Sequence, residues 1–159
     1  MRVLLASLLG ALVLVGHTSA RPDLEASAVC QATAPNGRTP PGERPGATRH
    51  GSRGLFVALY YPRLVARRVE PDGSVWEKFP WWADGPTALL EISGRRLDRA
   101  APPLQARVQP GWPANPQPFR GTAFWSSAIR FPTAGCWSVT GRSGRASLTF
   151  VVQVVKRAK

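Results

Sequence analysis

From Gly54 onward, apolar residues fall in short runs that favour strands over helices. VWEKF (75–79) and CWSVTG (136–141) alternate apolar and polar positions, as half-buried strands do. In ASLTFVVQVV (146–155), alternation predicts an inner face of Leu148, Phe150, Val152 and Val154, with Thr149 and Gln153 facing out. After residue 20 no helical period of 3.6 residues persists for three turns. The pattern therefore predicts an all-β protein, an antiparallel sandwich or barrel.

Turn and loop signals separate the predicted strands. The strands are expected at 54–61, 64–69, 75–79, 87–97, 101–108, 123–131, 136–141 and 146–155. A break at Ser93-Gly94 interrupts the fourth. PDGS (71–74) and GRSGR (141–145) are predicted turns, because glycine tolerates positive φ. FPWWADGP (79–86) and the proline-rich stretch 109–121 are predicted to be irregular loops.

Residues 21–53 have a different character from the rest of the chain. PNGRTPPGERPG repeats turn signals with almost no large apolar residue, so this segment cannot form a core of its own. We expect an extended Pro/Gly/Arg-rich arm over residues 21–53, lying on a β-sandwich domain formed by residues 54–159.

The first 20 residues have the build of a secretory signal. Arg2 is followed by an apolar run over 3–15 and by the small residues Thr18-Ser19-Ala20. The run is shorter than the about 20 residues that a spanning helix needs. Cleavage after Ala20 would leave 139 residues, with no membrane span, in a secreted, periplasmic or cell-surface location. An uncleaved interfacial anchor is the alternative interpretation.

The two cysteines, Cys30 and Cys136, are expected to form a disulfide in an exported protein. In the strand 136–141, Trp137 and Val139 share one face, which must be the core face. Cys136 therefore points out of the sandwich or lies at its rim. Since Cys30 begins the arm, the bond is predicted to fasten the arm to the outside of the folded domain.

The C-terminal segment resembles a known architecture. A Phe-Pro-x-x-Gly turn, an aromatic-x-Val strand, a polar hairpin and a long Val-rich strand, over residues 131–155, look like the closing hairpin of a bacterial immunoglobulin-like domain. The cysteine position departs from the core disulfide of antibody-type domains. The wider set PNGRTPPGERPG, KFPWW, GRRLD, APPL and FPTAGCW resembles short secreted bacterial proteins of unknown function. This resemblance implies an exported immunoglobulin-like β-sandwich and brings no catalytic residues with it.

The chain is strongly basic, with 21 Lys and Arg residues against nine Asp and Glu. Removal of Arg2 with the signal leaves a net charge of about +11, which attracts anionic polymers. Arginine supplies nearly all of this charge in a chain rich in Ala, Gly and Pro, so a compositional bias explains it as well as a selected binding face does. The basic residues are dispersed in pairs, which does not indicate a nucleic-acid partner.

The best candidate for function is a group of aromatic residues in the two predicted loops: Phe79, Trp81, Trp82 and Trp112. If exposed, these rings would suit stacking on a polysaccharide or on an envelope protein. The alternative is that the tryptophans fill the end of the core or pack beneath the arm. Tyr60 and Tyr61 close the first predicted strand, and alternation places one ring inside and one outside.

Catalysis is the least favoured class of function. Glu70, Asp72, Glu77 and Asp84 are close in sequence but occupy turn and strand positions, and His50 would be the only imidazole of the mature chain. No nucleophile elbow or phosphate loop is present, and no metal site or cofactor is expected. The sequence therefore predicts a non-catalytic binding domain; a structural, basic envelope protein that adheres to anionic wall polymer is the alternative.

Overall fold

The fold was analysed in a computed structural model, which describes residues 30–61, 63–66, 69–84, 89–109 and 122–156. The predicted signal segment 1–20 and Trp112, one of the predicted contact residues, lie outside the described residues. The described chain contains strands and no helix: β1 (Arg49–Ser52), β2 (Leu55–Ala58), β3 (Arg63–Ala66), β4 (Val75–Asp84), β5 (Glu91–Arg96), β6 (Gln105–Gln109), β7 (Thr122–Phe131), β8 (Gly135–Ser143) and β9 (Ala146–Lys156).

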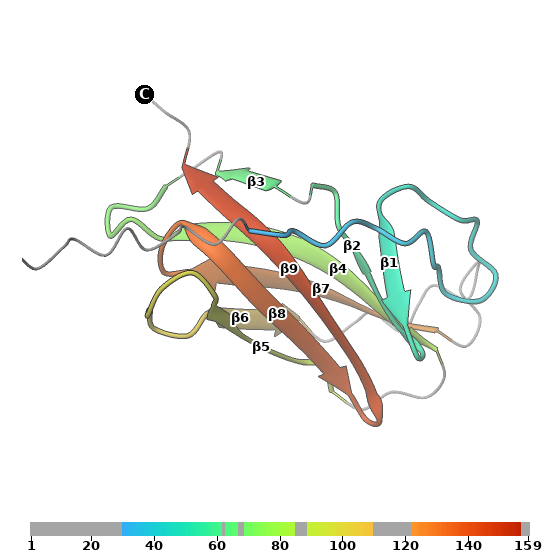
Figure 1. The fold of residues 1–159 in the computed structure, drawn as a ribbon. Helices are drawn as coiled ribbons and strands as arrows, with labels where there is room; N and C mark the ends of the chain where they lie inside the picture. The colour runs from blue at the N-terminus through green and yellow to red at the C-terminus, as the bar shows by residue number, and fades with distance from the viewer. Residues whose placement is uncertain (1–29, 62, 67–68, 85–88, 110–121, 157–159) are drawn as a thin grey trace, which may run out of the picture.

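The strands form two sheets that face each other (Figure 1). The first sheet has the order β1-β2-β4-β7-β6 and is antiparallel throughout. The second has the order β3-β9-β8-β5, in which β3 runs parallel to β9 and the other pairs are antiparallel. The all-β sandwich is confirmed, although the second sheet is mixed rather than purely antiparallel.

Side chains from the inner faces of both sheets form one hydrophobic core. Along β9, the alternation predicted from the sequence is confirmed: the four predicted inner residues are at most 3% exposed. Trp81 and Phe79 from the first sheet pack on Phe150 of the second, with ring centroids 5.7 and 5.6 Å apart. These aromatic contacts across the two layers hold the sheets together.

Three expectations about individual segments are wrong. KFPWW is not a loop, because β4 continues through it to Asp84, paired with β7 along its whole length. Gly94 does not break β5; a Cβ there would overlap the Ser138 carbonyl and the Leu104 side chain, so glycine permits this close approach. Four residues assigned to the arm, Arg49–Ser52, form the edge strand β1.

The predicted turns are confirmed. Gly73 has a positive φ of 82° in the turn after Glu70, and the Asp72 carboxylate accepts hydrogen bonds from the Ser74 amide and hydroxyl. The β8–β9 hairpin closes over two residues with Gly144 at φ 56°. Among the described residues, none belongs to a helix long and apolar enough to cross a bilayer.

Candidate binding site

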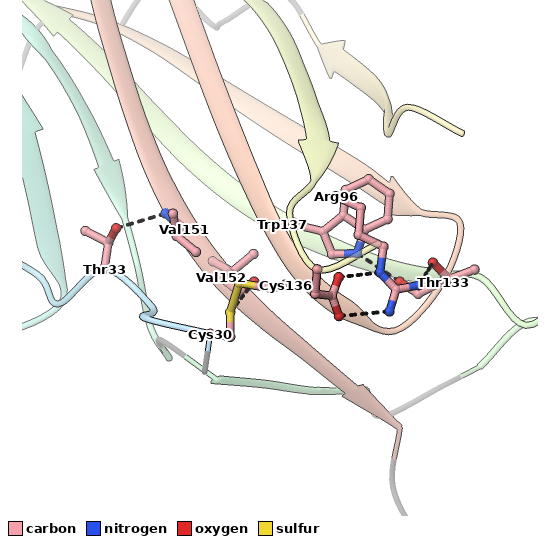
Figure 2. Close-up of a disulfide and its surroundings, with 9 residues drawn as sticks. Cys30, Thr33, Arg96, Thr133, Cys136, Trp137, Val151 and Val152 are labelled. Atoms are coloured by element: carbon pink, nitrogen blue, oxygen red, sulfur yellow. Dashed lines mark hydrogen bonds and ion pairs between the residues drawn. A yellow bond between two sulfur atoms is a disulfide. The ribbon is translucent and has the colours of Figure 1, made fainter. Parts of the chain in front are cut away.

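The disulfide predicted from the sequence is present and fastens Cys30, the first described residue, to the sandwich. Cys30 and Cys136 are bonded, with Cα atoms 5.4 Å apart and 106 positions between them along the chain. Figure 2 shows Cys30 lying over the outer face of β8 and β9. Cys136 is on the outer face, opposite in alternation to the fully buried Trp137, but it is only 5% exposed. This prediction of the cysteine pairing is confirmed.

After Cys30, the arm is held by hydrogen bonds to both sheets. The Thr33 amide donates to the Val151 carbonyl at 2.8 Å, and the Thr33 hydroxyl accepts from the Val151 amide at 2.9 Å (Figure 2). Further on, the Asn36 side chain donates to the Gly51 carbonyl and accepts from the Gly51 amide. Residues 30–36 thus run from β8 and β9 in one sheet to β1 in the other.

Of the four predicted contact residues, the structure buries three. Trp81 is 0% exposed, and its Nε1 donates a hydrogen bond to the Ser127 hydroxyl at 3.1 Å. The Ser127 hydroxyl in turn donates to the Phe79 carbonyl at 2.9 Å. Gly141 lies against the same indole, leaving no room for a Cβ. Because the one polar atom of its side chain has a hydrogen-bond acceptor inside the core, Trp81 is a packing residue, as the alternative interpretation expected.

Trp82 lies on the opposite face of β4 from Trp81, outside the main core. It packs on Phe124, with ring centroids 5.4 Å apart, and the Arg49 guanidinium lies 4.0 Å over its ring. Glu43 from the arm region pairs with Arg49 at 3.2 Å. This small outer cluster leaves Trp82 only 6% exposed, so its ring is covered by a cation–π contact rather than free for a ligand.

Among the residues that the structure describes, the exposed aromatic side chains are instead Tyr60 and Tyr61, at 53% and 60%. The expectation that one ring faces inward is wrong, because β2 ends at Ala58 and strand alternation no longer applies. The two rings line a pocket of about 290 Å³ together with residues of β3 and β4: Leu64, Val65, Glu77, Lys78 and Phe79. Phe79, one of the predicted contact residues, thus borders this pocket.

The pocket exists because the chain changes sheets at the two tyrosines. β2 pairs with β4 only opposite residues 81–83, whereas the next strand, β3, joins the other sheet beside β9. The segment Val75–Pro80 of β4 therefore has no strand neighbour on that side among the described residues. The sequence signal for this pocket was the Tyr60-Tyr61 pair at the end of the first predicted strand, to which no role was assigned.

Two of the acidic residues considered for catalysis, Glu77 and Asp84, lie too far apart to act as a pair. Glu77 and Asp84 are seven positions apart on one strand, about 23 Å at about 3.3 Å per residue, which exceeds the carboxylate spacing of glycosidases. Hydrogen bonds from Ser74, with a smaller contribution from Arg130, lower the pKa of Asp72, the opposite of what a general acid needs. No group of three or more His, Cys, Asp or Glu within the described segments could hold a metal ion.

Comparison with known proteins gave no assignment. No protein-family model matches the sequence, and a search of curated proteins found no significant match.

Proposed function

We propose that this chain is an exported, non-catalytic immunoglobulin-like domain that binds a polysaccharide at the pocket formed by Tyr60 and Tyr61. The single observation that carries the proposal is this pair of half-exposed phenol rings beside a pocket. The apolar faces of sugar rings stack on flat aromatic surfaces, and phenol hydroxyls bind sugar hydroxyls. A volume of about 290 Å³ lies at the lower end of the range for ligand pockets and suits one sugar unit.

The charged residues of the pocket support a polar ligand over an apolar one. Lys78 is exposed at the pocket, and the adjacent Glu77 carboxylate accepts a hydrogen bond from the Lys78 amide at 3.0 Å. Together they supply a donor and acceptors within reach of the rings. Such a combination of apolar wall and few polar groups is typical of sites that orient a ligand.

The immunoglobulin-like assignment is supported by the strand order. Immunoglobulin-type sandwiches place strands A, B, E and D in one sheet and C, F and G in the other. The corresponding strands here are β2, β4, β7 and β6 in one sheet and β5, β8 and β9 in the other, with β3 beside β9 and β1 as an added edge. In this architecture the loops and strand switches carry function, whereas the sheets form the scaffold.

Export is supported by the signal-like first 20 residues and by the disulfide, since such bonds persist in oxidising compartments. A fusion of residues 1–29 to a reporter that is active only outside the cytoplasm tests this part. The proposal of export requires activity from that fusion and loss of activity when residues 3–15 are deleted. Reporter activity that does not depend on residues 3–15 contradicts it.

Polysaccharide binding can be tested by electrophoresis of the oxidised protein through native gels that each contain one polysaccharide. The double variant Tyr60→Ser/Tyr61→Ser should lose the retardation shown by the wild type. The control Leu89→Ser/Leu97→Ser removes two other exposed apolar side chains, 80% and 42% exposed, and should keep it. Unretarded wild type across gels of neutral and acidic polysaccharides refutes the proposal and favours an envelope protein as the ligand.

A second candidate function is adhesion to an anionic wall polymer as a basic envelope protein. The observation that favours it is the net charge of +12, together with a groove beside the disulfide that is bordered by several cations.

A further inference from the structure

We propose that the groove beside the disulfide is a discrete binding site for a chain of oxyanion groups, phosphate or carboxylate, carried by an anionic polymer. The inference rests on the second candidate function and assigns it a place on the molecule. The groove has a volume of about 630 Å³, large enough for several oxyanion groups. Its lining includes the disulfide, Gln153 and Val155 of β9, and four cationic side chains: Arg63, Arg96, Arg99 and Lys156.

One of the four cations is neutralised and has a structural role. Arg96 donates from Nε and Nη2 to the two oxygens of Asp98, at 2.6 and 3.0 Å, and from Nη1 to the Thr133 hydroxyl at 2.9 Å. Its side chain is only 5% exposed. These hydrogen bonds from Arg96 lower the pKa of the Asp98 carboxyl, so the pair stays charged and closed over the physiological pH range.

The Arg96–Asp98 pair shapes the groove. It fixes the turn after β5, and the Leu97 amide donates to the Cys136 carbonyl at 2.8 Å, which ties this turn to β8 beside the disulfide. Arg99 follows directly and is exposed at the groove. Gly135 completes the wall, because a Cβ at that position would overlap the Arg96 guanidinium. Arg99 therefore follows a turn that is held in place by the Arg96–Asp98 pair and by the hydrogen bond to Cys136.

The other three cations are available to a ligand. Within the described residues, no acidic side chain forms an ion pair with Arg63, Arg99 or Lys156. Since the Asp98 charge is balanced by Arg96, the groove presents a net charge of about +3 to solvent. Guanidinium groups bind phosphate and carboxylate oxygens through two parallel hydrogen bonds, which favours oxyanions over halide ions. A polymer suits the site better than a single small ion because the cations come from three separate segments around an open groove.

The test compares two triple variants that change the net charge equally. Arg63→Gln/Arg99→Gln/Lys156→Gln removes the groove cations. Arg38→Gln/Arg142→Gln/Arg145→Gln removes three exposed arginines that do not border the groove. The probes are linear inorganic polyphosphate and polygalacturonate, titrated by calorimetry into the oxidised full domain at 0.05 and 0.15 M NaCl. Circular dichroism and the melting temperature confirm that both variants fold.

We expect the groove variant to bind about ten- to hundredfold more weakly than the wild type and the control variant to lose less than about threefold, since long-range attraction is screened at 0.15 M salt. Stronger binding of polyphosphate identifies the preferred oxyanion as phosphate, and stronger binding of polygalacturonate identifies it as carboxylate. Equal losses in both variants refute the groove and leave adhesion as a diffuse effect of net charge. Wild type that binds neither probe refutes adhesion itself together with the groove.

Discussion

Removal of the disulfide is expected to cost a large part of the stability of this domain. The bond joins residues that are 106 positions apart. In the chain-entropy model, a loop of that length raises the free energy of the unfolded chain by about 4–5 kcal/mol. Single domains have a free energy of unfolding of about 5–15 kcal/mol, so loss of the bond removes roughly a quarter of it or more. The corresponding fall in melting temperature is about 10–20 °C.

The hydrogen bonds of the arm decide whether, without the disulfide, the arm detaches from the sandwich before the sandwich itself unfolds. Thr33 makes two hydrogen bonds with Val151, each worth about 0.5–1.5 kcal/mol. Ordering each residue of the arm costs about 1–2 kcal/mol of backbone entropy, so these bonds alone do not hold it. Without the disulfide, the arm should therefore detach from β9 before the sandwich unfolds. Faster hydrogen exchange at the Val151 amide would report this detachment.

The assay is thermal unfolding followed by near-ultraviolet circular dichroism, with hydrogen exchange measured on the same samples. The double variant Cys30→Ala/Cys136→Ala is compared with the wild type, oxidised and reduced. Reduced wild type and the double variant should melt at similar temperatures, because both lack the crosslink. If the reduced and oxidised wild type melt within about 2 °C of each other and Val151 exchanges equally slowly in both, the stapling role is refuted.

Three further predictions concern the core and the arm. Ser127→Ala should lower the free energy of unfolding by about 1–3 kcal/mol, measured by urea titration, because the Trp81 Nε1 loses its buried acceptor; an unchanged value contradicts this role. Gly141→Ala should cost about 1–3 kcal/mol in the same titration, because the new Cβ overlaps the Trp81 indole; equal stability would mean that the indole shifts freely. Burial lowers the pKa of His50 below 6.5, with a hydrogen bond to the Ala34 backbone opposing the shift. The unfolded chain therefore binds the proton more readily, so stability should fall as the pH drops below about 6.5. Urea titrations at pH 7.5 and 5.5 should show this fall in the wild type and a smaller one in His50→Asn.

Much of the fold could be predicted from local patterns. The last strand, with its inner face of Leu148, Phe150, Val152 and Val154, was predicted within one residue of its limits because alternation acts over neighbouring positions. The cysteine pairing followed from two facts available in the sequence: only two cysteines, and an outward position for Cys136. β1 was missed because its residues, RHGS, carry no hydrophobic pattern, and it exists only by pairing with β2.

The candidate site was the least predictable feature. Prolines and tryptophans suggested a loop at residues 79–86, but Pro80 is tolerated in β4 because that part of the strand has an open side without a β2 partner. The burial of Trp81 depends on Phe150, 69 positions away, and the cover over Trp82 depends on Arg49. No local pattern contains these contacts.

Local patterns in the sequence thus predict the class of fold, the inner faces of β8 and β9, and the Cys30–Cys136 crosslink. These features depend on side-chain alternation, turn residues and the number of cysteines, all of which act locally or by elimination. Which aromatic rings are exposed and which cations share a groove depends on how distant segments pack in the folded chain. Exposure is set by what lies across from a residue in space, and the change of sheet after β2 brings together segments that are distant along the chain.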